Sequence, residues 1–262
     1  MQLKDKVFVV TGAGNGMGRQ VALGLLSQGA RVALVDLSPS ALEETLQLAP
    51  AGARASTHVV NVSDSDAVSA LPDLVIAAHG TVDGLVNVAG TIHRFAPVTE
   101  LDSNECQRII NVNLWGTVNM CMAFLPVLRQ RPVASLVNIS SLSALIPFAG
   151  QTFYGATKAA VKQFSEGLYQ ELSGSNIAVT TVFPGNISTN ISANSGVKMI
   201  DAGGRKVRAT GPEAAGSQIV EAIKKGSFRA VIGADARILD ALVRLSPKRA
   251  TDIIARQMKS VL

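Results

Sequence analysis

The chain has 262 residues, of which 47% are hydrophobic and 16% charged; this predicts one substantial core and excludes a disordered protein. Two cysteines, Cys106 and Cys121, are too few for a disulfide framework, and no Cys/His spacing typical of zinc occurs. The polar start, Met1 to Lys6, differs from a signal peptide, and no long apolar run predicts a membrane span. We therefore expect a cytoplasmic protein with no metal and no integral membrane association.

The formal net charge of +5 comes from 24 Lys and Arg against 19 Asp and Glu. The basic residues are scattered and do not alternate with aromatic residues, so we expect a solvated surface and no nucleic-acid partner. The end of the chain is more basic. A minor alternative is that the amphipathic stretch Leu239–Leu262 lies on a membrane surface.

Apolar strand-like runs alternate with helix-length stretches almost from end to end. The predicted strands are Val7–Val10, Arg31–Leu37, Ala55–Val60, Gly84–Val88, Ala134–Ser140, Ile177–Phe183 and Ala230–Ile232. The predicted helices are Met17–Gln28, one opening at Ser38-Pro39, one from Ser63 or Asp64 to His79, Ser103–Phe124, Thr152–Ser173, one opening at Gly211-Pro212, and Ile238–Leu262, which Pro247 interrupts.

This alternation predicts an α/β protein with a single doubly wound parallel sheet of seven strands and helices on both faces. We expect one domain over residues 1–262, with a C-terminal helical tail at 237–262. The long irregular stretch 187–210 is predicted to be a lid over a substrate. The ligand should bind at the carboxyl ends of the strands, where the strand order reverses.

A glycine-rich turn follows the first predicted strand and opens the first helix. Gly12, Gly16 and Gly18 have the spacing G-x-x-x-G-x-G and not the G-x-G-x-x-G of many dinucleotide sites. Glycine permits the tight turn and lets backbone N–H groups approach a pyrophosphate. The turn, which includes Asn15 and Met17, is therefore predicted to bind a dinucleotide.

Asp36 ends the second predicted strand. A carboxylate there can accept hydrogen bonds from the adenosine ribose and would repel a 2′-phosphate. Neither Leu37 nor Asn15 supplies the Arg or Lys that would accommodate such a phosphate. The sequence therefore favours NAD over NADP; the alternative is that Asp36 only caps the following helix, although Ser38 can also do this.

Tyr154 and Lys158 are four residues apart at the start of a predicted helix and so share a face. A tyrosine phenol, with a reference pKa of about 10, is a poor base at neutral pH, but a neighbouring ammonium lowers the phenol's pKa. The alternative is an ordinary surface pair. Ser140 and Ser141 end the fifth strand, where a hydroxyl can stabilise charge on a substrate oxygen. Asn113 lies mid-helix, where it could simply bend the helix.

These features together resemble the short-chain dehydrogenase/reductase family over nearly the whole chain. The resemblance rests on motifs in a particular order: Gly12/Gly16/Gly18, Asn61-Val62, Asn87-Val88-Ala89-Gly90, Asn113, Ser141, Tyr154/Lys158 and Pro184-Gly185. It implies a Rossmann fold, a nicotinamide cofactor and oxidoreductase activity. The family's usual gap between its catalytic Ser and Tyr selects Ser141 over Ser140.

The resemblance also implies residue roles. Tyr154 would be the general acid/base, Lys158 would lower its pKa and bind the nicotinamide ribose, and Ser141 would stabilise the reacting oxygen. Asn113 would hold a water in a proton relay. The further cofactor contacts implied are Asn61 and Val62 at the adenine, Asn87, Ala89 and Gly90 beside the cofactor, and Pro184, Gly185, Ile187 and Thr189 at the carboxamide.

Three departures from the family pattern stand out. Val88 replaces a second asparagine, and Asn61 stands where Asp is common, although its amide oxygen could still accept a hydrogen bond. The usual Asp-Gly-Gly ending is absent, and the chain reads Val231 to Ala236 instead. Because that ending helps to build a tetramer interface, a homodimer through the helices Ser103–Phe124 and Thr152–Ser173 is expected alongside the family's homotetramer.

Apolar residues suggest a hydrophobic substrate. They are Leu142, Ile146, Phe148 and Phe153 near the catalytic positions, and Ile187, Ile191, Val197, Met199 and Ile200 in the expected lid. Any of them could equally pack in the core. His93 could reach the pocket, although a lone histidine is more often structural.

We therefore predict an NAD-dependent oxidoreductase that interconverts a hydrophobic secondary alcohol and its ketone. A first alternative is a 3-oxoacyl thioester reductase, for which Arg129 and Arg131 would bind an acidic carrier protein. A second is a non-catalytic NAD-binding sensor or scaffold.

Overall fold

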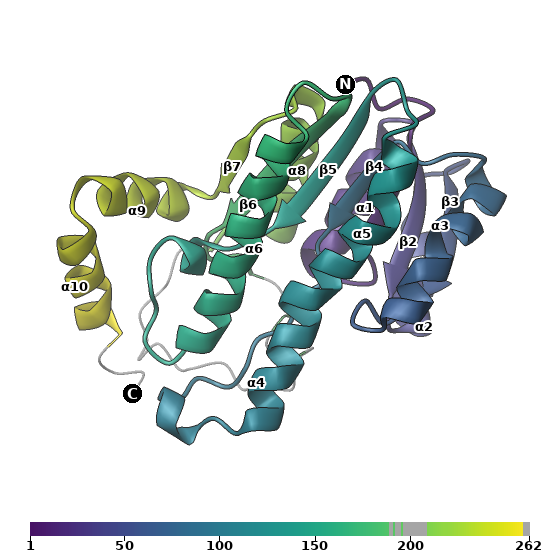
Figure 1. Cartoon of the computed structure of the whole chain (residues 1–262). Helices are drawn as coiled ribbons and strands as arrows, with labels where there is room; N and C mark the ends of the chain where they lie inside the picture. The colour runs from purple at the N-terminus through teal and green to yellow at the C-terminus, as the bar shows by residue number, and fades with distance from the viewer. Residues whose placement is uncertain (189–190, 192–194, 196–208, 259–262) are drawn as a thin grey trace.

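A computed structural model describes residues 1–188, 191, 195 and 209–258, and its central feature is one parallel sheet (Figure 1). The sheet has seven strands in the order β3-β2-β1-β4-β5-β6-β7. They are β1 (Val7–Thr11), β2 (Arg31–Asp36), β3 (Arg54–Val59), β4 (Gly84–Asn87), β5 (Ala134–Ile139), β6 (Ile177–Pro184) and β7 (Arg229–Ile232). All neighbouring strands pair in parallel, which confirms the predicted fold class.

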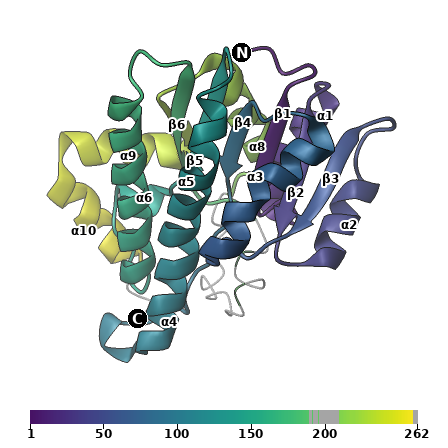
Figure 2. The same cartoon turned by 45° about the vertical axis from the view of Figure 1, so that its right-hand side comes forward.

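Helices connect the strands and cover both faces of the sheet; α3 and α5 lie in front of the strands in Figure 2. The helices are α1 (Gly16–Ser27), α2 (Pro39–Gln47), α3 (Ser65–His79), α4 (Ser103–Ile110), α5 (Gly116–Leu128), α6 (Thr152–Glu171), α8 (Pro212–Lys225), α9 (Ala234–Leu245) and α10 (Pro247–Gln257). Short 3₁₀ turns lie at Val98–Glu100 and Leu142–Ala144, and a π-helical turn lies at Asn111–Trp115.

The central strand β1 shows why both faces are covered. All five of its residues are buried, and successive side chains of a strand point to opposite faces. Val7 and Val9 join one core cluster, with residues of α3, α5 and α6. Phe8 and Val10 join the other, with residues of α1 and α8. A strand that is apolar on both faces therefore needs a helical layer on each side.

The strand order reverses between β1 and β4. The chain runs from β1 outward through β2 to β3 and then crosses back, so that β4 pairs with the other side of β1. The loops that follow β1 and β4 diverge at this point and leave a crevice at the carboxyl ends of the strands.

Two helical stretches differ from the sequence prediction. The helix predicted over Ser103–Phe124 is divided by the π-helical turn and continues to Leu128 in spite of Pro126, because Leu128 is buried in the core. The helix predicted to begin at Ile238 begins at Ala234, as α9. Pro247 opens α10, which suits proline because the first residue of a helix needs no N–H donor.

Within the described residues, the helical stretch Ser103–Leu128 is long and apolar enough to cross a membrane, with a mean hydropathy of 1.2. Met120, Phe124 and Leu128 of this stretch point into the core against the sheet. Packing in the fold accounts for these apolar side chains.

Candidate active site

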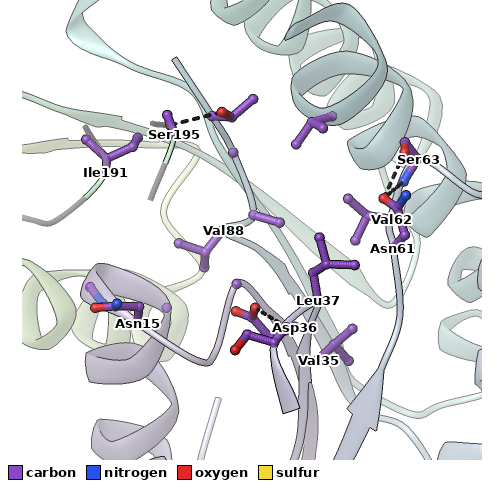
Figure 3. Close-up of a pocket in the computed structure, with 18 of the residues that line it drawn as sticks. Asn15, Val35, Asp36, Leu37, Asn61, Val62, Ser63, Val88, Ile191 and Ser195 are labelled. Carbon is purple, nitrogen blue, oxygen red and sulfur yellow. Dashed lines mark hydrogen bonds between the residues drawn. The ribbon is translucent and has the colours of Figure 1, made fainter. Parts of the chain in front are cut away.

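A cavity of about 910 Å³ opens where the strand order reverses (Figure 3). Its walls come from the carboxyl ends of the first four strands, the start of α1, and α4. Ile191 and Ser195 lie across it from Asn61 in Figure 3. The predicted cofactor residues in its lining are Gly12, Asn15, Gly16, Met17, Gly18, Asp36, Leu37, Asn61, Val62, Ala89 and Gly90.

The glycine turn requires glycine at specific positions. Gly12 has φ +66°, and a methyl group added there would lie 3.0 Å from the backbone of Ala89. A methyl group at Gly18 would lie 2.0 Å from the carbonyl oxygen of Gly12. The start of α1 is therefore pressed against the end of β1, which directs its unbonded N–H groups toward the cavity.

Asp36 lies at the end of β2, on the cavity wall. One oxygen of its carboxylate accepts from the N–H of Gly14 (2.9 Å), and the other accepts from the N–H of Ser38 (3.1 Å). Asp36 thus joins the glycine turn to the start of α2. The nearby guanidinium of Arg19 is engaged by the carbonyl of Gly14, the hydroxyl of Thr45 and the carboxylate of Glu44.

Asn61 lines the cavity differently from the expectation. Its amide oxygen already accepts from the N–H (3.1 Å) and the hydroxyl (2.8 Å) of Ser63, as the dashed lines of Figure 3 show. The expectation that this oxygen is available to adenine is therefore wrong, because both of its lone pairs are used. The NH₂ group remains for a ligand.

The end of β4 is held by residues beneath the cavity. The hydroxyl of Thr11 accepts from the N–H groups of Val88 (3.0 Å) and Ala89 (3.1 Å). Asn87 is buried and donates to Asn138 of β5 (2.8 Å). Asn87 therefore lies outside the cavity lining and supports the sheet, whereas Ala89 and Gly90 face the cavity.

Gly90 connects the cavity with two of the catalytic candidates. A methyl group added to Gly90 would lie 3.3 Å from Lys158 Nζ and 3.3 Å from Asn113 Oδ1. Lys158 is buried and donates to the carbonyl of Ile139 (3.0 Å). Only a backbone without a side chain thus separates the end of the cavity from this ammonium group.

The two serines after β5 have different partners. The hydroxyl of Ser140 donates to the carbonyl of Lys158 (2.8 Å) and so ties β5 to α6. The hydroxyl of Ser141 accepts from the N–H of Ser143 and also makes a hydrogen bond with the phenol of Tyr154. Of the two serines, Ser141 is therefore the one that interacts with the side chain of Tyr154. It is also the one that the family's usual gap between serine and tyrosine selects.

Burial changes the acid–base behaviour of Tyr154 and Lys158. It raises the pKa of the Tyr154 phenol above its ordinary value, and the hydrogen bond with Ser141 opposes this only in part. Burial also lowers the pKa of Lys158 to about 8. The predicted lowering of the tyrosine pKa by Lys158 is not found, because Nζ lies 6.0 Å from the ring centroid and a low-polarity environment disfavours both charged forms.

Asn113 is fully buried within the π-helical turn. Its side-chain oxygen accepts from the N–H of Thr91 (2.8 Å), and its NH₂ donates to the carbonyl of Thr91 (2.9 Å) and to Thr157 of α6 (3.2 Å). π-helical turns occur frequently at functional sites. This one joins α4, the loop after β4, and the helix that carries Tyr154 and Lys158.

The substrate candidates are dispersed. His93 is fully buried, and its Nε2 accepts from the backbone N–H of Tyr154 (3.1 Å), so it lies behind the tyrosine. Leu142 and Phe148 join an apolar cluster with Ala250 and Ile254 of α10. Phe153 is partly buried, and Ile191 lines the cavity.

The segment after β6 is described only in part. The N–H of Gly185 donates to Ile232 (2.9 Å), Pro184 ends β6, and Ile187 forms a parallel bridge with Thr210. Pro184, Gly185 and Ile187, the described members of the expected carboxamide site, lie outside the cavity lining. Thr189, Val197, Met199 and Ile200, and most of the expected lid 187–210, lie outside the described residues.

Several lining residues carry no recognisable motif. Asn104, Gln107, Arg108 and Asn111 line the cavity from α4 and the turn that follows. The guanidinium of Arg108 donates to the hydroxyl of Thr91 (2.7 Å), another lining residue. For Thr91 the sequence offered only its position, directly after Gly90, as a sign that it lines the cavity.

Arg129 and Arg131, the predicted carrier-protein contacts, lie at the end of α5, next to the start of β5. Arg131 bonds to Asp83 (3.0 Å), which precedes β4. This is the amino end of the sheet, whereas the cavity and Ser141 lie at the carboxyl end. These two arginines therefore lie at the opposite end of the sheet from Tyr154.

The fold, the glycine turn and Asp36 together define a dinucleotide-binding α/β protein. Comparison with known proteins is more specific: the family model described as short chain dehydrogenase matches residues 6–199, so the chain belongs to this family of oxidoreductases.

Individual relatives agree. The chain is 38% identical over 252 residues to the SadH protein of Mycobacterium tuberculosis, covering 92% of this chain and 91% of that one. It is 34% identical over 190 residues to the 3-oxoacyl-(acyl-carrier-protein) reductase FabG of Thermotoga maritima, covering 72% and 77%. The crystal structure of a short chain dehydrogenase/reductase from Burkholderia phymatum in complex with NAD is 26% identical and covers 94% and 96%, with a TM-score of 0.80.

Proposed function

We propose that this protein is an NAD-dependent oxidoreductase that interconverts a hydrophobic secondary alcohol and its ketone. The observation that carries the proposal is the position of Gly90, which lines the dinucleotide-sized cavity and lies directly beside Lys158 and Asn113. A cofactor in the cavity would thereby end next to the residues that can move a proton.

The residues of the cavity fit NAD. The N–H groups at the start of α1 can bind the pyrophosphate, Asp36 the adenosine ribose and the NH₂ of Asn61 the adenine. NADP fits less well, because its 2′-phosphate would meet the Asp36 carboxylate, and the nearby Arg19 is engaged. The related Burkholderia protein was crystallised with NAD. When bound, the nicotinamide supplies or takes up the hydride.

In this proposal Tyr154 and Ser141 act on the substrate oxygen. During ketone reduction the phenol of Tyr154 donates its proton to that oxygen, and the raised pKa of Tyr154 keeps the phenol protonated at neutral pH. Ser141 donates a hydrogen bond to the same oxygen; loss of such a donor costs about 3–4 kcal/mol of barrier. Lys158, whose pKa burial lowers to about 8, would bind the nicotinamide ribose, the role that the family resemblance implies.

The Tyr154→Phe variant tests this proposal. Turnover should be lost, because phenylalanine has no proton to donate, while NADH binding measured by fluorescence titration stays near that of the unchanged protein. Tyr169→Phe is the matched control, since Tyr169 is the other tyrosine of the chain and packs against Phe228. Near-normal activity of Tyr154→Phe on a panel of alcohols and ketones, followed by NADH absorbance, would refute the mechanism.

The apolar surroundings of the serine and tyrosine support a hydrophobic substrate. Leu142 and Phe148, which follow Ser141 closely in the chain, pack with residues of α9 and α10. In the same panel, kcat/KM should therefore rise as the alkyl or aryl groups of the ketone become larger. Faster turnover of small polar ketones would contradict this substrate class.

A 3-oxoacyl thioester reductase is the second candidate, and the similarity to FabG of Thermotoga maritima favours it. Arg129 and Arg131, the expected contacts of an acidic carrier, lie at the opposite end of the sheet from Tyr154. Comparing kcat/KM for acyl thioesters with that for simple ketones separates the two candidates. A sensor or scaffold would bind NADH but convert no substrate of the panel.

A further inference from the structure

The loop after β4 is fastened to the first turn of α6, the helix that carries Tyr154. The N–H of Ala96 donates to the carbonyl of Gly150 (3.1 Å), and the side chain of Gln151 donates to the carbonyl of His93 (2.9 Å). The backbone N–H of Tyr154 donates to Nε2 of His93 (3.1 Å). Two of the three contacts therefore use His93.

The start of α6 needs such a partner. The first N–H groups of a helix have no acceptor within the helix, and the side chain of the N-cap residue commonly accepts one of them. Gln151, the N-cap of α6, makes no such side-chain bond. Tyr154 is the third residue of α6, the position that an N-cap side chain usually serves. His93 serves it here from a segment 61 residues away in the chain.

The hydrogen bonds also determine which nitrogen of His93 carries the proton. Nε2 accepts from Tyr154 and therefore has no proton, so the proton lies on Nδ1, which donates to the carbonyl of Arg94 (2.6 Å). A second proton would set two N–H groups against each other at a helix N-terminus, where a positive charge is unfavourable. The ring is fully buried and both of its nitrogens are engaged.

We propose that His93 is a positioning residue: as a neutral imidazole it caps α6 at the backbone of Tyr154 and so holds the phenol in line with Ser141. This inference rests on the proposed function, because it needs Tyr154 as the proton donor. His93 itself is fully buried and lies outside the cavity lining. Without the cap the first turn of α6 can shift, and small displacements of a reacting group slow a reaction strongly.

Two substitutions test the proposal. His93→Met fills the space but offers no comparable acceptor, whereas His93→Gln keeps an acceptor at a similar reach. We expect kcat of His93→Met to fall about 10- to 100-fold, with KM and NADH affinity within about twofold of the unchanged protein. His93→Gln should recover most of the loss. Rates are counted per NADH-binding site, so that unfolded protein does not count as slow enzyme.

Controls separate this inference from the proposed function. His58→Gln, at a histidine on β3, should leave kcat unchanged. Activity of the Tyr154→Phe variant would contradict the proposed function, regardless of the results for the His93 variants. If Tyr154→Phe is inactive while His93→Met turns over normally, or if His93→Gln is as slow as His93→Met, only the positioning role fails.

One measurement needs no activity. Nitrogen-15 NMR of the unchanged protein distinguishes the two imidazole tautomers, and the signals missing from His93→Gln identify His93 among the three histidines. A proton on Nδ1 with a free Nε2 is expected. A proton on Nε2, or on both nitrogens at pH 7, overturns the proposal even if His93→Met does not fold.

Discussion

Asp36 shows how one side chain can serve both the loop and the ligand. Its carboxylate holds the N–H of Gly14 and lies on the cavity wall, where an adenosine ribose would bind. The glycine turn and its acidic partner could be predicted from the sequence, because a strand, a turn and a helix are local features. The hydrogen bond between Gly14 and Asp36 could not, since it joins two different strand ends.

Replacing Asp36 should change the cofactor preference. We expect Asp36→Arg to lower kcat/KM for NADH at least about tenfold and to raise it for NADPH, because the charge next to the ribose is reversed; tenfold corresponds to about 1.4 kcal/mol. Asp36→Asn, which keeps an acceptor for Gly14, should lose less with NADH. An unchanged ratio of the two kcat/KM values in Asp36→Arg would contradict the assignment of NAD.

At the scale of elements, Asp83 joins three of them at the amino end of the sheet. It is buried, and its carboxylate accepts from the N–H of Val7 at the start of β1, from Lys6 and from Arg131 after α5. Burial opposes ionisation of Asp83, but these hydrogen bonds outweigh burial and lower the pKa of its carboxyl group. The charged form therefore stabilises the fold.

The stabilisation by Asp83 should depend on pH. Because the pKa of the folded state is lowered, the contribution is complete above the unfolded pKa of about 3.9 and is lost as the pH falls through the folded value. Asp83→Asn should cost about 3 kcal/mol of unfolding free energy at pH 7, measured with urea, since it leaves two cations with a weaker partner. The difference should shrink toward pH 3.

Asp5→Asn is the matched control, because Asp5 pairs with Arg54 on the surface. Such exposed pairs contribute little to stability, because solvent and salt screen the two charges. Equal costs of the two substitutions at pH 7, or a difference that does not shrink toward pH 3, would show that Asp83 does not join the elements in this way.

The division of the helix over residues 103–128 is a second result at this scale. The apolar pattern predicts a helix there, and a helix is found. The π-helical turn around Asn113 was not predicted, because the hydrogen bonds of Asn113 to Thr91 and Thr157 come from distant segments. The apolar periodicity of a segment does not indicate which distant residues will bond to its side chains.

At the scale of the whole molecule, α5 and Trp115, the residue before it, present apolar side chains to solvent. Trp115 and Met122 are 51% and 68% exposed and lie seven residues apart, so they share a helix face. Large exposed apolar residues on one face favour an interface between subunits. We therefore propose that this face takes part in the predicted homodimer, whose interface would also include α6.

We expect the protein to be a dimer by size-exclusion chromatography with light scattering, and Met122→Glu to shift it toward the monomer, because a charge would be buried in the interface. Leu74→Glu, at an exposed leucine of α3, is the control and should leave the mass unchanged. A monomeric unchanged protein, or a dimer that Met122→Glu does not weaken, would contradict this interface.

The sequence by itself determined the alternation of strands and helices, the glycine turn and the Tyr154–Lys158 spacing, because each depends on residues close together in the chain. The alternation in turn predicted the parallel sheet. Only the tertiary structure decided which partners the buried polar groups have: His93 bonds to the backbone of Tyr154, and Arg131 bonds to Asp83. It also decided that burial raises the pKa of Tyr154. The physical reason is that hydrogen-bond partners and desolvation depend on which distant segments pack together.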